Sequence, residues 1–102
     1  MTSYNFGLPQ RTIDELLNYF KGNPYIEKVC VYGSRAKGNY RRGSDIDFAV
    51  WLTEGGYASR IWGDLDELPT PYKFDVTDYK SLTHEGMKKS IDTDGVLFYS
   101  RD

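Results

Sequence analysis

The chain has 102 residues, of which 39% are hydrophobic and 27% are charged. This size and composition are typical of one globular domain with a small core, so we expect residues 1–102 to form a single domain. Lysines and arginines number 13 and acidic residues 15, which gives a net charge of −2. That balance excludes a positive field over the whole surface. We therefore expect no nucleic-acid binding, and any cationic function must be local.

The cysteine content and the apolar runs bear on location. The single cysteine, Cys30, cannot form an internal disulfide and lies in an apolar run, which favours a reducing cytoplasm. The first ten residues lack the charged start and apolar stretch of a signal peptide. No apolar run approaches the length that spans a bilayer. We expect a cytoplasmic protein without membrane association.

The first half of the chain predicts a helix, a strand and a short helix. A capping-box pattern at Thr12 and Glu15 predicts a helix that starts at residue 12, and apolar residues at helical spacing carry it to about residue 21. β-Branched and aromatic residues over 26–32 predict a strand that a glycine ends. The glycine-punctuated segment 34–44 predicts at most a short helix.

The second half alternates in the same way. The nearly continuous apolar run 46–52 predicts a central strand covered on both faces. A weaker helix over 57–68 precedes a strand over 72–78. A helix over 81–92 and a strand from residue 95 complete the chain. This order predicts an α/β fold of the α+β kind, in which a small mixed sheet packs against helices.

Two carboxylates interrupt the apolar strand and its entry. Asp45 and Asp47 stand two residues apart, so on a strand they point to one face at roughly 7 Å spacing. Carboxylate oxygens suit Mg²⁺, which prefers a few carboxylates together with substrate phosphates. Without a cation, two acids in an apolar strand repel each other and lose solvation. We therefore favour a metal site over a capped turn followed by an exposed strand residue.

The turn before the short helix has the chemistry of a phosphate site. Gly33 lets a phosphate approach the backbone, free amides of the next turn attract anions, and the Ser34 hydroxyl adds a donor. Nearby side chains that could also hold the nucleotide are Arg35, Lys37, Arg41, Arg42 and Ser44. For Arg41 and Arg42 a solvated loop is an equally good interpretation.

A third carboxylate would complete a site for two metal ions about 3.5–4 Å apart, as in phosphoryl and nucleotidyl transfer. Asp75 is the best candidate, because it lies in the strand 72–78 and alternates with the apolar residues Phe74 and Val76. It could also act as the base for an incoming hydroxyl. The alternative is a solvated acid on an edge strand. Asp78, at the strand end, is the reserve candidate.

These residues resemble a known signature. Gly33-Ser34, ten intervening residues and Asp45-Ile46-Asp47 look like the GS-x10-DxD motif of the minimal nucleotidyltransferases (MNT proteins) of the polymerase β-like superfamily. The later segment 74–76, with its third acid, agrees with this motif. The resemblance covers essentially the whole chain. It implies a minimal polymerase β-like nucleotidyltransferase palm.

The resemblance implies an activity and a partner. MNT proteins bind ATP with Mg²⁺, transfer AMP to a hydroxyl and release pyrophosphate. Many are antitoxins of a HEPN-domain ribonuclease toxin and modify one of its tyrosines, so a hetero-oligomer is expected. The family pattern assigns Gly33 and Ser34 to the triphosphate, Asp45 and Asp47 to metal, and Asp75 to metal and acceptor activation.

Two other functions stay open. A binding-only antitoxin would neutralise its toxin by contact alone. A small hydroxylated molecule could be the acceptor, although this usually needs an added substrate-binding domain. RNA is a weaker candidate, because the chain has no extended basic or aromatic stripe. Tyr57 and Trp62 fit a partner surface and a packed core equally well.

Overall fold

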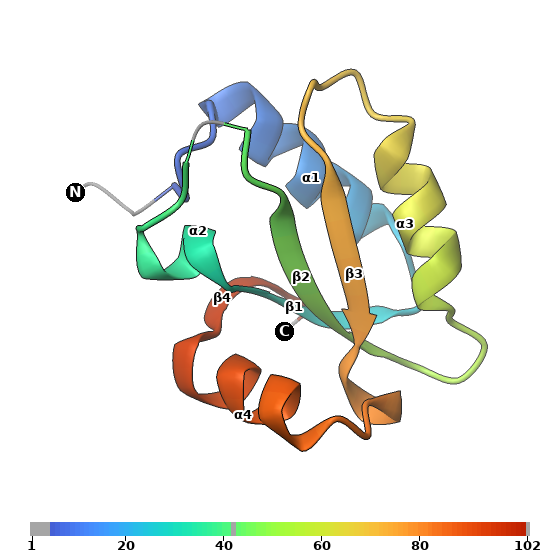
Figure 1. Cartoon of the computed structure of the whole chain (residues 1–102). Coiled ribbons are helices and arrows are strands. Elements are labelled where there is room, and N and C mark those ends of the chain that lie inside the picture. Colours follow the sequence, from blue (N-terminus) through green and yellow to red (C-terminus); the bar gives the residue numbers. More distant parts are fainter. Residues whose placement is uncertain (1–4, 42, 102) are drawn as a thin grey trace.

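A computed structural model describes residues 5–41 and 43–101 (Figure 1). Helices and strands alternate along the chain in the predicted order. The elements are α1 Gln10–Gly22, β1 Ile26–Tyr32, α2 Ser34–Lys37, β2 Ile46–Leu52, α3 Ala58–Asp66, β3 Phe74–Asp78, the short 3-10 helix η1 Tyr79–Ser81, α4 Glu85–Asp94 and β4 Val96–Ser100. The two strands predicted over 26–32 and 46–52 have the predicted bounds.

The four strands form one mixed sheet in the order β3-β2-β1-β4. β1 is antiparallel to both of its neighbours, β2 and β4, whereas β2 and β3 are parallel. A parallel pair needs a crossover connection, and α3 provides it between β2 and β3. The predicted fold class, a small mixed sheet packed against helices, is therefore confirmed.

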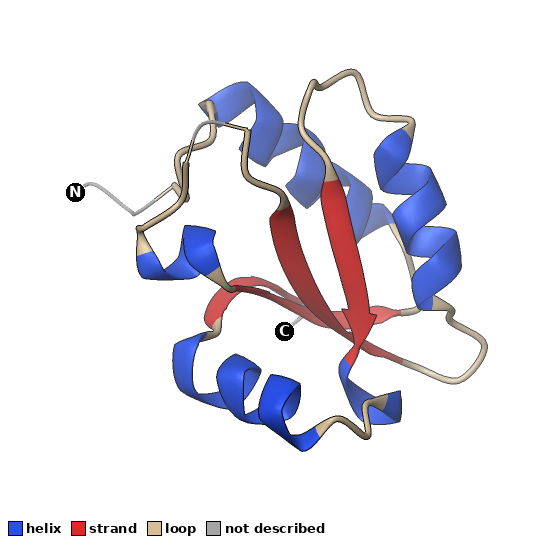
Figure 2. Ribbon diagram, viewed as in Figure 1, coloured by secondary structure: helices blue, strands red, loops and turns tan. Residues whose placement is uncertain are grey.

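Helices cover both faces of this sheet (Figure 2). On one face α1 and α3 bury the main core, where the Phe20 and Phe48 rings meet edge to face with centroids 5.3 Å apart. On the other face Ile91 of α4 packs against Tyr32 and Ala49. The expectation that β2 is covered on both faces is confirmed.

The first helix begins two residues earlier than predicted. It starts at Gln10 after Pro9, which has an extended backbone and makes no side-chain cap. Thr12 is a buried residue inside the helix, so the capping-box prediction is wrong. Pro9 occupies the N-cap position, and its carbonyl oxygen accepts the first helical hydrogen bond, from the Ile13 N–H at 3.2 Å.

The last helix begins later than predicted, at Glu85. Asp78 ends β3 and accepts a hydrogen bond from the Lys80 backbone N–H, which starts η1 instead. His84 then caps α4, with its Nδ1 accepting from the Met87 N–H at 3.0 Å. The segment 81–92, which was predicted as one helix, is thus divided by side-chain caps between the end of η1 and α4.

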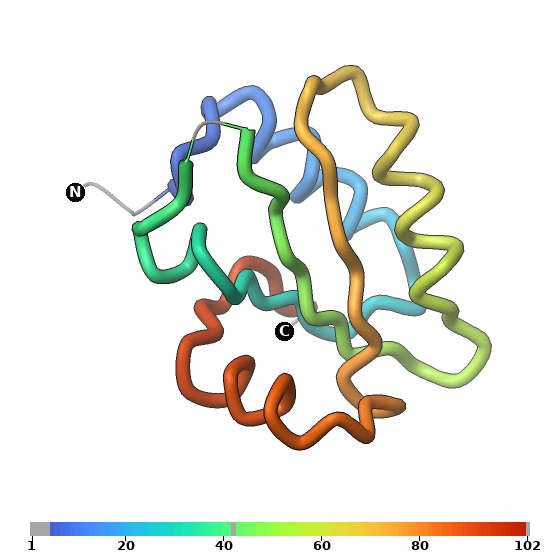
Figure 3. Tube along the Cα trace, in the orientation of Figure 1, coloured from blue at the N-terminus to red at the C-terminus, as the bar shows by residue number. Residues whose placement is uncertain are grey.

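Residues 38–41, which follow α2, lie beside residues 5–9, which are far from them in sequence (Figure 3). Arg35 joins the two by donating to the Phe6 carbonyl oxygen at 2.8 Å. In the described ranges, no helix has both the length and the apolar character needed to cross a membrane.

Candidate active site

Strand register brings acidic side chains from two strands to one end of the sheet. In the antiparallel pair Tyr32 lies opposite Asp47, and in the parallel pair Asp47 lies opposite Asp75. Side chains of register partners point to the same face, so Asp47 and Asp75 are neighbours there. Asp45 precedes β2 by one residue. Asp75 is exposed while Phe74 is buried, as the alternation in the sequence predicts.

The carboxyl group of Asp47 is in an unfavourable setting for negative charge. Burial raises its pKa, and the negative charges of Asp75 and Asp45 raise this pKa further. Asp47 therefore lies in the negative fields of the other two acids. A cation placed among them would relieve both the repulsion and the lost solvation.

The turn at Gly33 and Ser34 lies against the same carboxylate. Gly33 has φ +75°, a conformation that favours glycine, and a Cβ built there would stand 2.5 Å from Asp47 Oδ2. Asp47 thus points toward the Gly33-Ser34 turn rather than away from it. The predicted phosphate turn and the predicted metal ligand share one side of the molecule.

The donor chemistry fits a hard divalent cation, since all candidate ligands are carboxylates. Within residues 5–41 and 43–101, however, no three His, Cys, Asp or Glu side chains lie close enough to hold one ion as they stand. Asp47 and Asp75 are the pair that the sheet itself sets side by side. Mg²⁺ commonly takes one or two carboxylates and completes its shell with water and phosphate oxygens.

Arg35 is placed differently from the prediction. The sequence assigned it to the nucleotide, but its side chain is 2% exposed. Its Nε and Nη2 donate to the Ser44 carbonyl oxygen at 3.2 and 3.0 Å, and its Nη1 donates to Phe6. The guanidinium also lies over the Tyr40 ring at 4.7 Å. We correct the assignment: Arg35 anchors the segment before β2, because backbone carbonyls occupy its donors.

The remaining predicted nucleotide ligands have local partners. Lys37 Nζ lies 3.4 Å from Asp94 Oδ2, so it links α2 to α4, and its side chain is half exposed. The Ser44 hydroxyl oxygen accepts from the Arg41 N–H at 2.9 Å and so stabilises the turn before Asp45. Arg42 lies outside the described residues. The half-exposed Lys37 side chain could leave Asp94 and turn toward a ligand.

The reserve candidate, Asp78, does not join the acids. Its two carboxylate oxygens accept from the Lys80 N–H at 3.1 Å and from the Ser81 hydroxyl at 3.1 Å. It caps η1 at the opposite end of β3 from Phe74. This placement leaves Asp75 as the acid of β3 that faces Asp47.

A polar contact that the sequence does not predict lies beside the acids. The Tyr32 hydroxyl lies 3.0 Å from Thr77 Oγ1, and the Tyr32 side chain is buried. Because β2 separates β1 from β3, this bond passes over β2, where Ala49 leaves room. Burial, and then the charges of Asp47 and Asp75, raise the Tyr32 pKa, whereas the Thr77 bond lowers it. The only signal in the sequence was the position of Tyr32 directly before Gly33.

A cavity of about 660 Å³ lies elsewhere, between α1 and α3, and none of the predicted site residues lines it. It opens near the start of β1 and the end of β2, whereas the acids lie at the other end of both strands. The cavity and the carboxylates therefore suggest two different locations for the active site. We locate the candidate active site by the carboxylates, because only they carry the predicted reaction chemistry.

Known structures share this fold. A chain of a toxin–antitoxin complex with AMP-PNP superposes with a TM-score of 0.63 at 23% identity, over 91% of this chain and 74% of that one. A chain of the MntA–HepT toxin–antitoxin gives 0.59 at 18% identity, over 90% and 73%. A chain of the complex of tri-AMPylated Shewanella oneidensis HEPN toxin with MNT antitoxin gives 0.59 at 17% identity, over 89% and 71%. At these identities the likeness shows the fold.

No curated protein matches the chain. Residues 14–102 match the family described as polymerase beta, nucleotidyltransferase. The matched range holds every residue predicted for the site and all four strands. The chain belongs to the polymerase beta nucleotidyltransferase family.

Proposed function

We propose that this nucleotidyltransferase moves AMP from ATP to a hydroxyl group of a partner protein. The observation that carries the proposal is the position of Asp47. Its carboxylate lies against the Gly33 turn and next to Asp75 across the parallel strands. Family membership supports nucleotide transfer, and the similar chains come from complexes with AMP-PNP or with an AMPylated toxin.

Asp45, Asp47 and Asp75 would hold Mg²⁺, as one ion or two. Bound Mg²⁺ supplies positive charge that neutralises the phosphate oxygens as negative charge develops on them. The raised pKa of Asp47 supports this assignment, since a cation is what these crowded carboxylates lack. ATP is the substrate that brings the remaining oxygen ligands.

Different residues of the chain would have different roles in the reaction. Gly33 and Ser34 would hold the triphosphate, with Lys37 leaving Asp94 to join them. The acceptor oxygen attacks the α-phosphorus, and the bond from this phosphorus to the pyrophosphate oxygen breaks. Asp75, exposed on β3, takes the hydroxyl proton, and pyrophosphate leaves with the electron pair.

The partner would be a HEPN-domain ribonuclease toxin and the acceptor one of its tyrosines, which makes this chain an antitoxin. Support comes from the similar chains, which belong to toxin–antitoxin complexes. A chain that transfers AMP to another protein must also bind that protein, so we expect a hetero-oligomer. A cytoplasmic location stays a prediction that rests on the single cysteine.

The test uses ATP labelled at the α-phosphate, Mg²⁺ and the product of the neighbouring gene. We expect label on the partner with the wild-type chain and a loss of about 100-fold or more with Asp47→Asn, because the charge that positions the reacting phosphate is gone. Asp66→Asn, on an exposed position of α3, is the matched control. Unchanged labelling by Asp47→Asn would contradict the site. Toxin neutralisation without any labelling would instead indicate a binding-only antitoxin.

A further inference from the structure

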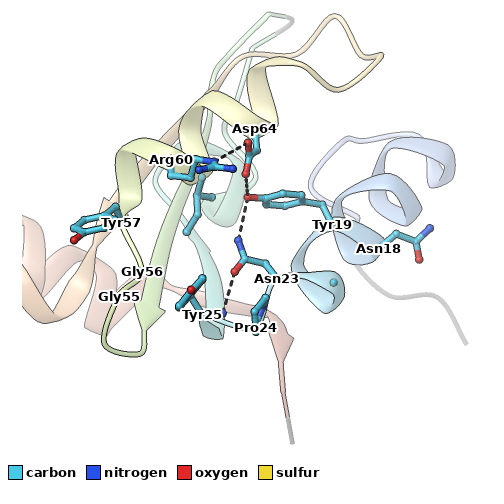
Figure 4. A pocket seen from close by; sticks show the side chains of 12 residues that line it. Asn18, Tyr19, Asn23, Pro24, Tyr25, Gly55, Gly56, Tyr57, Arg60 and Asp64 are labelled. Atoms are coloured by element: carbon cyan, nitrogen blue, oxygen red, sulfur yellow. Dashed lines mark hydrogen bonds and ion pairs between the residues drawn. The ribbon is translucent and has the colours of Figure 1, made fainter.

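The cavity between α1 and α3 is built from a different set of side chains than the acidic site (Figure 4). It is open to solvent on one side and has a volume of about 660 Å³. Among the polar and aromatic residues that line it are Tyr19, Asn23, Tyr25, Tyr57, Arg60 and Asp64. Since β1 and β2 each have seven residues, the cavity and the acids are about 20 Å apart along the strands.

A hydrogen-bonded chain fixes one carboxylate in the cavity wall. Asn23 Nδ2 donates to the Tyr19 hydroxyl oxygen at 3.2 Å, and the Tyr19 hydroxyl donates to Asp64 Oδ2 at 2.6 Å. Burial and the Asp64 carboxylate raise the pKa of Tyr19 to about 12. The phenol therefore remains a donor at neutral pH, and Asp64 remains an oriented acceptor.

The second oxygen of this carboxylate already meets a guanidinium. Arg60 Nε lies 3.5 Å from Asp64 Oδ1, one helical turn away on α3. The Arg60 side chain is 80% exposed, and ion pairs of this exposed kind contribute little to stability. Arg60 thus shows that a guanidinium fits beside Asp64. Because this ion pair is weak, the guanidinium of another protein can replace that of Arg60.

Aromatic side chains border the opening. Tyr25 is 46% exposed and Tyr57 is 69% exposed. Tyr25 packs closely on the turn after β2, where a Cβ on Gly56 would stand 2.8 Å from the Tyr25 Cβ. Exposed tyrosines are enriched at protein interfaces, and their ring faces attract cations.

We propose that this cavity binds an arginine side chain of a partner protein. Asp64 would accept hydrogen bonds from the incoming guanidinium, and the rings of Tyr25 and Tyr57 would flank it. Arginine is favoured over lysine, because its planar group stacks on rings and can donate two parallel hydrogen bonds to one carboxylate. The proposal goes beyond nucleotide transfer, since it uses no residue of the acidic site.

The binding test uses Nα-acetyl-arginine amide as the probe and compares it with the citrulline and lysine analogues. Citrulline keeps the shape of arginine but lacks its charge. Backbone NMR shifts are followed during each titration. We expect the arginine probe to shift the amides of Gly55, Tyr57 and Asp64, and to bind at least about threefold more tightly than the lysine probe. Equal shifts with citrulline, or shifts centred on the acidic site, would overturn the proposal.

Substitutions test the roles of the two charged residues. Arg60→Ala removes the internal competitor, so we expect the arginine probe to bind about fivefold more tightly. Asp64→Asn should weaken binding about tenfold or more. Because Asp64 also accepts from Tyr19, Tyr57→Ala is a second variant that leaves this hydrogen bond intact and should weaken binding as well. The control is Asp66→Asn on the same helix, and equal effects of Asp64→Asn and Asp66→Asn would overturn the proposal.

Discussion

Gly33 meets two independent demands at a single position. Its φ of +75° is unfavourable for other residues, and the space where a side chain would begin is filled by the Asp47 carboxylate. A methyl group there must strain the backbone and push the carboxylate away. The glycine is therefore what allows the predicted phosphate turn and the predicted metal ligand to lie in contact.

Gly33→Ala should lower the free energy of unfolding by about 1–3 kcal/mol, because the combination of φ +75° and ψ −152° is one that essentially only glycine adopts. Displacement of Asp47 should also remove most AMP transfer. Urea unfolding and the labelling assay measure the two effects. Gly22→Ala is the control, since Gly22 ends α1 and has no atom within 4 Å of an added Cβ. An active Gly33→Ala protein of wild-type stability would contradict this account.

The raised pKa of Asp47 has a consequence for stability. The folded state holds the Asp47 proton more tightly than the unfolded chain, so ionisation of Asp47 costs stability as pH rises through its folded pKa. Below the unfolded pKa this cost is absent. Asp47→Asn, which removes the charge, should therefore raise the melting temperature at pH 7.

The measurement is thermal unfolding of wild type and Asp47→Asn from pH 3 to pH 8 without divalent ions. We expect the advantage of the variant to grow with pH through the titration of Asp47 and then to level off. Mg²⁺ with ATP should stabilise wild type but not the variant. A variant less stable than wild type at pH 7 would show that the Asp47 charge is not strained.

At the scale of elements, one side-chain bond joins the outer two of three neighbouring strands. Tyr32 at the end of β1 meets Thr77 of β3 across β2, beside Asp47 and Asp75. Since backbone ladders already hold β1 to β2 and β2 to β3, the extra bond fixes how the acid-bearing ends lie relative to one another. We regard Tyr32 and Thr77 as positioning residues.

Tyr32→Phe keeps the buried ring and removes the hydroxyl. It should lower the free energy of unfolding by about 1 kcal/mol, the net contribution of a typical hydrogen bond. Thr77→Val should cost a similar amount, and the double variant little more than either one. Urea unfolding measures all three. Tyr99→Phe serves as control, since in the described part of the chain no hydrogen bond of its hydroxyl occurs. If the losses in the free energy of unfolding of the two single variants simply added up in the double variant, the hydrogen bond would make no contribution to stability.

The positioning role of Tyr32 also predicts an effect on the kinetics of AMP transfer. If Tyr32 holds the acids in place, Tyr32→Phe should lower kcat for AMP transfer several-fold and shift the acidic limb of its pH profile, with KM for ATP less affected. If Tyr32→Phe lowered stability but left kcat and the pH profile unchanged, Tyr32 would have a structural role and no positioning role.

A helix or strand could be predicted well when the pattern that indicates it lies within its own residues. The bounds predicted for the strands 26–32 and 46–52 are correct because apolar and β-branched residues dominate both, with Glu27, Lys28 and Asp47 as the charged exceptions. Helix starts were harder. The pattern at Thr12 and Glu15 looked like a cap, but burial of Thr12 and the proline before Gln10 moved the start. A cap is a contact between a side chain and the backbone, and several sequences near one helix start can offer it.

At the scale of the whole molecule, the sheet order decides which acids meet. The spacing of Asp45 and Asp47 and the alternation around Asp75 are visible in the sequence, so these residues could be predicted. Their proximity depends on β2 and β3 being parallel neighbours in one register, which a single sequence does not specify. The family resemblance implied that the three acids share one site, whereas the register that brings them together is seen in the structure.

Arg35 shows the opposite case. A cation one residue after a phosphate turn was a reasonable nucleotide ligand, yet its side chain turns inward to the carbonyl oxygens of Phe6 and Ser44. Those acceptors come from segments remote in sequence, so no local pattern indicates them. The cavity at Asp64 was hidden for the same reason, because it needs α1 and α3 to pack side by side.

The central claim is that the Gly33 turn and the carboxylates of β2 and β3 form one site for Mg²⁺ and ATP. Calorimetric titration of ATP into the chain, with Mg²⁺ and with a chelator, tests it most directly. We predict binding that requires the metal and falls about tenfold or more in both Asp47→Asn and Asp75→Asn, while Asp66→Asn binds like wild type. Binding of Mg²⁺ and ATP by the Asp47→Asn protein with wild-type affinity would contradict the claim.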